Sequence, residues 1–165
     1  MEKRPKRKPN RLENWDYTHP GCYFVTICTA GRENLFWDVG ADIIRPEQLP
    51  LSPLGIRAEQ TIQEIPLHYP HTFVEHYVVM PNHIHLLLTL RSCDDGRLIA
   101  APTKSLSTII AQMKRTVSKE AGRPIWQKSF HDHIIRSESD FLSVWNYISA
   151  NPIRWSEDIY YDPNF

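Results

Sequence analysis

The fold is decided by residues 73–90, FVEHYVVMPNHIHLLLTL, near the middle of the 165-residue chain. β-Branched and aromatic residues fill 73–80 and an apolar run fills 83–90, so each segment is predicted to be a strand. Pro81-Asn82 interrupts them, because proline lacks the N–H that a continuing strand would donate. A connection this short joins antiparallel neighbours, so the sequence predicts a β-hairpin.

The remaining elements are predicted from composition, capping residues and apolar spacing. In chain order they are a strand over 22–29, a helix over 53–65 that starts at Ser52-Pro53 and stops before Pro66, a helix over 104–120, a strand over 125–135, and a helix from the Ser137-x-x-Asp140 capping box to Asn151-Pro152. This order predicts a ferredoxin-like α+β fold, an antiparallel sheet with helices on one face, plus one extra C-terminal helix.

Composition is typical of one domain with a substantial core, since 41% of the residues are hydrophobic. No apolar run approaches the ~18 residues of a membrane span, and the basic start leads into no secretory core, so neither a membrane partner nor a signal peptide is expected. Three cysteines without metal-like pairing indicate free thiols in a reducing, cytoplasmic setting. We expect a flexible basic head at 1–14, a domain at 15–155 and a tail at 156–165.

The charge is zero overall, with 19 basic and 19 acidic residues, but it is unevenly distributed. Residues 1–11 carry six basic residues against one acidic residue, and residues 104–136 carry seven against two. Clustered charge sets the local attraction for phosphate, so the balance does not exclude a nucleic-acid partner. A disordered, solubilising head is the alternative interpretation of the first cluster.

Two His-x-His pairs are candidate metal ligands. His83 and His85 point to the same face of their predicted strand, because strand side chains alternate, and two imidazoles so spaced can share one ion. His131 and His133 repeat the pattern in the 125–135 strand. Spacing does not choose between the pairs, and histidines on a solvated sheet face are the alternative for either.

The last predicted helix places Tyr147 and Asn151 four residues apart, so the two side chains are adjacent on its surface. The tyrosine hydroxyl could therefore reach whatever Asn151 contacts. From spacing alone, a half-buried tyrosine and an asparagine that caps the helix before Pro152 are the stronger interpretation.

Together these segments resemble a known family. Residues 78–87 (VVMPNHIHLL) are similar to the His-hydrophobic-His motif of the single-tyrosine HUH transposases, and residues 147–152 (YISANP) resemble the tyrosine helix of the REP-associated tyrosine transposases. Residues 125–136 (IWQKSFHDHIIR) resemble the strand before that helix, and residues 23–26 (YFVT) fit the opening strand. The resemblance spans residues 15–155.

The resemblance implies a ferredoxin-like, metal-dependent endonuclease and strand transferase that acts on single-stranded, hairpin-forming DNA. Tyr147 matches the nucleophile, which would form a 5′-phosphotyrosine intermediate, and His83, His85 and Asn151 match the metal ligands. The implied ion is Mg²⁺ or Mn²⁺, whereas ligand type alone would rank Mn²⁺ or Zn²⁺ above Mg²⁺. His133 matches a supporting active-site histidine.

The role of His131 stays open, because an aromatic residue is common at that position in the family. Trp126 and Phe130 are candidates for base stacking, with core packing as the alternative. Basic side chains of the second cluster are predicted phosphate contacts, with a merely solvated surface as the alternative: Lys104, Lys114, Arg115, Lys119, Lys128 and Arg136. The implied location is the cytoplasm, with nucleoid association in a prokaryote, and the protein could be a monomer or a homodimer.

Two other functions fit the same residues. A non-catalytic nucleic-acid-binding module would keep the fold and lose cleavage. A small metallohydrolase with another substrate would use the four paired histidines and would not need Tyr147.

Overall fold

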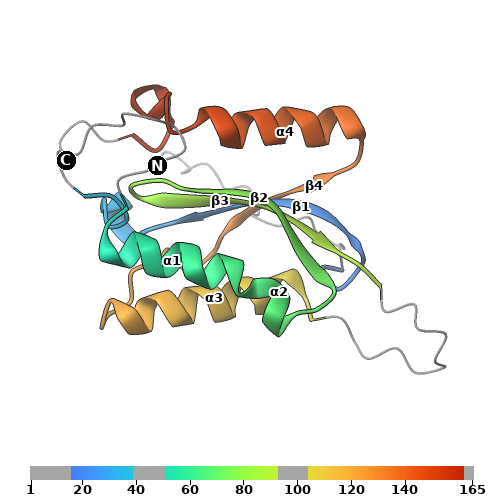
Figure 1. The fold of residues 1–165 in the computed structure, drawn as a ribbon, viewed down its shortest axis with the longest axis horizontal. Helices are drawn as coiled ribbons and strands as arrows, with labels where there is room; N and C mark the ends of the chain where they lie inside the picture. Colours follow the sequence, from blue (N-terminus) through green and yellow to red (C-terminus); the bar gives the residue numbers. More distant parts are fainter. Residues whose placement is uncertain (1–15, 39–50, 93–103, 162–165) are drawn as a thin grey trace, which may run out of the picture.

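The computed structural model describes residues 16–38, 51–92 and 104–161. Within these ranges four strands form one antiparallel sheet in the order β2-β3-β1-β4 (Figure 1). They are β1 (Gly21–Cys28), β2 (Thr72–Val79), β3 (His83–Leu90) and β4 (His131–Ile135). The central pair, β3 and β1, holds the predicted His-x-His strand in the middle of the sheet.

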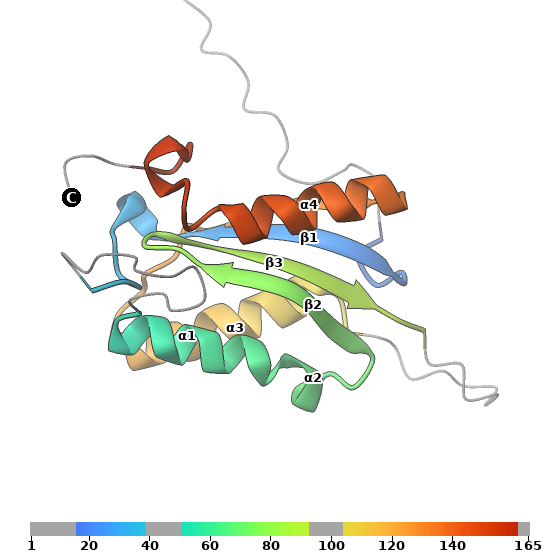
Figure 2. The same ribbon diagram turned by 45° about the horizontal axis from the view of Figure 1, so that its top comes forward.

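Helices cover both faces of the sheet. The helices α1 (Pro53–Gln63), α2 (Ile65–His68) and α3 (Leu106–Glu120) lie on one side, and α4 (Glu138–Ala150) runs across the other (Figures 1 and 2). The chain order βαββαβ followed by α4 is the predicted ferredoxin-like α+β arrangement with an extra C-terminal helix.

The alternation of β3 divides its side chains between two packed layers. Ile84, Leu86 and Leu88 are fully buried against the apolar stripes of α1 and α3, where the main core lies. On the opposite face Leu87 joins a smaller cluster with Ile148 of α4. His83 and His85 therefore lie under α4, away from the main core.

The predicted helix starts are confirmed by their capping contacts. The hydroxyl of Ser52 accepts a hydrogen bond from the backbone N–H of Gly55, and the hydroxyl of Ser137 accepts one from Asp140. The prediction that the first helix stops before Pro66 is not met exactly: α1 ends at Gln63, and α2 restarts with this proline in its first turn, where no N–H is required.

The predicted strand over 125–135 is too long, because β4 comprises only its last five residues. Trp126 makes an isolated bridge to Thr29, and its indole Nε1 donates to the carbonyl of Lys114 at 3.0 Å. Phe130 is only 5% exposed and belongs to the main core. The structure thus shows Trp126 and Phe130 packed in or against the core rather than available for base stacking.

Several predictions fall partly outside the described ranges. The basic head at 1–14 lies outside them, as does Cys93, while Cys22 and Cys28 are free thiols. Within the three described ranges, none of the helices has the length and apolar character needed to cross a membrane.

Candidate active site

The two histidines of β3 form the centre of the site. The side chains of His83 and His85 are 0% and 1% exposed, and their Nε2 atoms lie 3.1 Å apart. Burial lowers the pKa of His85 to about 3, and burial together with the neighbouring imidazole holds the pKa of His83 well below its usual range. Both rings are therefore neutral at pH 7, the form that binds metal ions.

Hydrogen bonds to the Nδ1 atoms orient the two rings. The side-chain Nδ2 of Asn82 donates to the carbonyls of Arg32 and Tyr160, so its Oδ1, 2.9 Å from His83 Nδ1, must be the acceptor. The proton of His83 is then on Nδ1, and its Nε2 carries the lone pair, directed at His85 Nε2. His85 Nδ1 lies 2.9 Å from the hydroxyl of Thr26 on β1. Such outer contacts are typical of metal-ligating histidines.

The donor atoms fit a divalent cation. Two nitrogens that each lie about 2.1 Å from one ion at a right angle are about 3.0 Å apart, close to the separation of the two Nε2 atoms. The amide oxygen of Asn151, a residue only 4% exposed, is buried and has no hydrogen-bond partner among the residues that the structure describes. A carboxylate oxygen of Asp158 joins the two imidazoles in a cluster whose ligand atoms all lie within 4.8 Å of one another.

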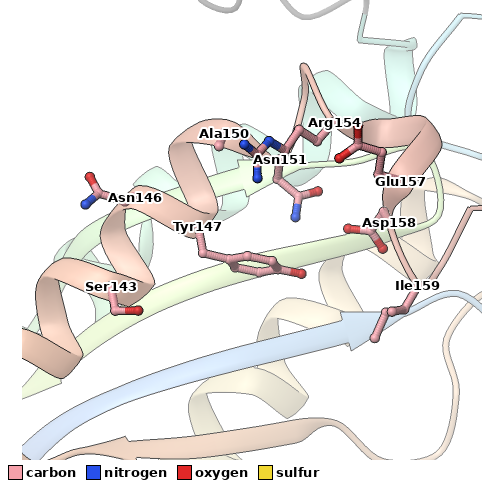
Figure 3. A pocket seen from close by; sticks show the side chains of 9 residues that line it. All are labelled: Ser143, Asn146, Tyr147, Ala150, Asn151, Arg154, Glu157, Asp158 and Ile159. Carbon is pink, nitrogen blue, oxygen red and sulfur yellow. The ribbon is translucent and has the colours of Figure 1, made fainter.

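Tyr147 brings its hydroxyl to this cluster from α4. The hydroxyl oxygen lies 3.4 Å from His85 Nε2, and the ring packs edge-on against Phe24 and the imidazole of His85. The side chains of Asn151 and Asp158 interact with the same hydroxyl, and Figure 3 shows all three gathered at one end of a cavity. Burial, and then the charge of Asp158, raises the pKa of Tyr147, so the phenol is protonated at neutral pH.

The position of α4 follows from its packing on β2 of the same chain. The ring of His76 stacks on Trp145 with centroids 4.3 Å apart, and its Nε2 lies 2.8 Å from the hydroxyl of Ser149. Ile148 is fully buried in the smaller core. Asn151 is the C-cap residue of this helix, as one of the two sequence interpretations expected. This position also brings its side chain to the candidate site, so the two interpretations do not exclude each other.

The second histidine pair lies beside the site but is arranged differently. His131 and His133 pair with Thr26 and Phe24 of β1, which places them on the same sheet face as His85. Both are exposed, and His133 Nε2 lies 2.9 Å from a carboxylate oxygen of Asp140. They line a cavity of about 240 Å³ together with His85 and Tyr147. Among the described residues, the buried pair of β3 is therefore the pair whose spacing and burial suit a shared ion.

Residues after α4 also contribute to the candidate site, and those from residue 156 on lie where the sequence suggested only a tail. After a short turn of 3-10 helix (Trp155–Glu157), the ring of Tyr160 packs 4.6 Å from that of His83. Asp158 and Arg154 line a cavity of about 690 Å³ with Tyr147 (Figure 3). No periodicity marks this segment, so its contribution could not be read from the sequence.

The predicted phosphate contacts are spread over both layers of the molecule. Arg115 and Lys119 are exposed on α3, across the sheet from the two histidines, and Lys104 just precedes that helix. The Lys114 ammonium donates to the carbonyls of Gln127 and Ser129 at 2.6 and 3.2 Å. The two that flank β4 are exposed: Lys128 and Arg136.

Comparisons with known proteins identify the family of the chain. Residues 48–151 match the family model "Transposase IS200 like". An uncharacterized protein of Haemophilus influenzae is 31% identical over 94% of this chain and 93% of its own, and a putative REP-associated tyrosine transposase of the same organism is 28% identical over 84% and 74%. A REP-associated tyrosine transposase of Escherichia coli K12 is 30% identical over 47% of this chain and 42% of its own.

Among solved structures, a REP-associated tyrosine transposase bound to a REP hairpin superposes with a TM-score of 0.60. It is 23% identical, and the match covers 88% of this chain and 74% of that one, which supports the shared fold. The family match, the relatives and the fold lead to one conclusion: the chain belongs to the IS200-like transposases and resembles their REP-associated tyrosine transposases.

Proposed function

We propose that this transposase is a metal-dependent endonuclease and strand transferase for single-stranded, hairpin-forming DNA. Tyr147 is the proposed nucleophile, and His83, His85 and Asn151 are the proposed ligands of Mg²⁺ or Mn²⁺. The observation that carries the proposal is the 3.4 Å separation of the Tyr147 hydroxyl from His85 Nε2, in a site with neutral imidazoles and an unpartnered amide oxygen.

The chain's own residues account for the chemistry in the following way. A bound divalent cation supplies Lewis-acid polarisation of the scissile phosphate. The phenolic oxygen of Tyr147 forms a bond to phosphorus, the bond from phosphorus to the 3′-oxygen breaks, and the phenolic proton is finally carried by the released 3′-hydroxyl. The phosphotyrosine ester conserves the bond energy, so a 3′-hydroxyl can later reverse the step and join DNA without ATP.

The DNA is expected to lie on the α4 side of the sheet. Arg136 is exposed where the chain leads from β4 into α4, and Arg154 lines the cavity beside Tyr147. Lys128 is exposed three residues before β4 and is proposed as a further phosphate contact. A hairpin in a solved relative supports hairpin DNA as the partner. Four more basic residues are proposed as phosphate contacts: Lys104, Lys114, Arg115 and Lys119. For Lys104, Arg115 and Lys119 the DNA would have to reach α3. Lys114 already donates to two backbone carbonyls and would have to share or leave them.

His133 is proposed to support the site through its contact with Asp140, at the first turn of the helix that carries Tyr147. An enzyme that acts on genomic DNA works where the DNA is, so we propose a cytoplasmic, nucleoid-associated location. The metallohydrolase alternative loses its support, because the four histidines do not form one ligand set among the described residues.

The nucleophile is tested by trapping the covalent intermediate. With a labelled hairpin oligonucleotide and Mn²⁺, we expect the wild type to give a protein–DNA adduct on a denaturing gel. Tyr147→Phe should still bind the hairpin and give no adduct, while Tyr161→Phe, which alters an exposed tyrosine, should give the wild-type amount.

An adduct from Tyr147→Phe would refute the nucleophile assignment. A wild type that binds the hairpin equally well with chelator and never forms an adduct would indicate the non-catalytic binding module instead.

A further inference from the structure

We infer that Asp158 is a fourth protein ligand of the metal ion, supplied by the segment that follows α4. This inference rests on the proposed metal site at His83 and His85 and adds a residue that lies outside the HUH motif and the tyrosine helix. It makes the segment after α4 part of the metal centre.

The first support is the geometry of the donor atoms. A carboxylate oxygen of Asp158 and one nitrogen from each of His83 and His85 all lie within 4.8 Å of one another. Ligand atoms on opposite sides of an ion with bonds of about 2.1 Å are about 4.2 Å apart. The three atoms are therefore near the separations of a shared ion before any ion is bound.

The second support is a chain of hydrogen bonds that ties Asp158 to His83. One carboxylate oxygen of Asp158, Oδ1, accepts from the backbone N–H of Tyr160 at 2.7 Å. The carbonyl of Tyr160 accepts from Asn82 Nδ2 at 2.8 Å, and Asn82 Oδ1 accepts from His83 Nδ1 at 2.9 Å. Asn82 thus orients an imidazole and anchors the segment that carries the carboxylate.

The third support is electrostatic. Asp158 is only partly exposed, and it forms no ion pair with a lysine or arginine among the residues described. Within the described part of the chain, the buried amide oxygen of Asn151 also has no hydrogen-bond partner, and Figure 3 shows both side chains beside the Tyr147 hydroxyl. Two electron-rich oxygens and two imidazole lone pairs that converge in this way create a negative potential that a bound cation would stabilise.

The carboxylate would change the character of the site. Two imidazoles and an amide oxygen are neutral, whereas a fourth, anionic oxygen ligand partly offsets the ion's charge and favours Mn²⁺ or Mg²⁺. A six-coordinate ion with four protein ligands would keep two positions for the scissile phosphate or water.

The experiment measures Mn²⁺ binding to the full chain without DNA, by the electron paramagnetic resonance signal of the free ion. Asp158→Asn should weaken binding at least tenfold, and Asp158→Ser should do so as well. Glu157→Gln, which removes the same charge from the neighbouring exposed residue, should stay within twofold of the wild type. His85→Ala should abolish binding at this site.

A second readout separates a ligand from a distant charge. If Asp158 coordinates the ion, its replacement admits an extra water, so the water-proton relaxivity of bound Mn²⁺ should rise in Asp158→Ser and not in Glu157→Gln. Circular dichroism of each metal-free variant verifies that it is folded.

The outcomes distinguish this inference from the metal site itself. If His85→Ala abolishes binding while Asp158→Asn and Asp158→Ser bind like the wild type, Asp158 is no ligand and the histidine site stands. Equal weakening by Glu157→Gln and Asp158→Asn, with unchanged relaxivity, also overturns the inference. If the wild type and His85→Ala bind Mn²⁺ alike, both the proposed metal site and the role of Asp158 are wrong.

Discussion

The buried imidazoles of His83 and His85 couple the stability of the metal-free protein to pH. A histidine buried in its neutral form takes up a proton more readily when the chain is unfolded, where its pKa is about 6.5. The stabilisation is therefore complete above that value and is lost as pH falls toward the folded-state pKa of His85, about 3. Acid should therefore weaken the fold of the metal-free protein as pH falls below about 6.5.

We expect the free energy of unfolding of the metal-free protein, measured with urea, to fall between pH 7 and pH 5 by about 2 kcal/mol through His85, and His83 should add to this fall. His85→Gln should remove the part of the pH dependence that His85 contributes. The matched change of an exposed histidine, His68→Gln, should leave it intact. A wild type equally stable at both pH values would show that the rings are not held neutral.

Single residues also show where sequence analysis stops. Local periodicity predicts that His83 and His85 share one face of a strand and that Tyr147 and Asn151 are adjacent on a helix. The choice of this histidine pair and the roles of Tyr147 and Asn151 come from the family resemblance. Asn82 and Asp158 act through contacts that exist only after the sheet and the segment after α4 have come together. No local pattern encodes such contacts, which is why the sequence singled out neither residue for the site.

At the scale of the elements, Gly55 fixes how α1 docks. A Cβ at this position would collide with the backbone carbonyl of Phe36, and a backbone atom cannot move aside as a flexible side chain can. Gly55→Ala should therefore destabilise the protein by about 1–3 kcal/mol, even though alanine favours helices more than glycine by about 1 kcal/mol. Urea denaturation checks this against Gln60→Ala, an exposed change in the same helix that should be neutral or stabilising. A more stable Gly55→Ala would mean that α1 is not held this closely.

Helices and strands were predictable to the extent that local signals define them. The caps at Ser52 and Ser137 and the alternation in β3 are local, and these predictions are confirmed. Residues 125–130 have strand-like composition, yet their aromatic side chains leave the sheet to fill space beside α3, as Trp126 and its bond to Lys114 show. Tertiary packing overrides β-propensity there.

For the whole molecule, the topology separates charges that are adjacent in the sequence. The 104–136 cluster is one basic block along the chain, but Arg115 lies on α3 while Arg136 leads into α4 on the other side of the sheet (Figure 2). A linear count of charge could not show this separation. The zero net charge is thus compatible with one arginine, Arg154, at the site and with other cations remote from it.

The topology also brings the residues of the candidate site together within one chain. The Tyr147 hydroxyl lies 3.4 Å from His85 Nε2 of its own chain. A link of only two residues, Arg136 and Ser137, joins β4 to α4. Trp145 of α4 also stacks on His76 of β2. Exchange of α4 between two copies would break this packing. Mixing Tyr147→Phe with His85→Ala should therefore leave adduct formation on the hairpin oligonucleotide absent, as in each variant alone. Recovery of a quarter or more of the wild-type adduct in the mixture would show that the tyrosine acts on a partner's metal site and that α4 is exchanged in the active assembly.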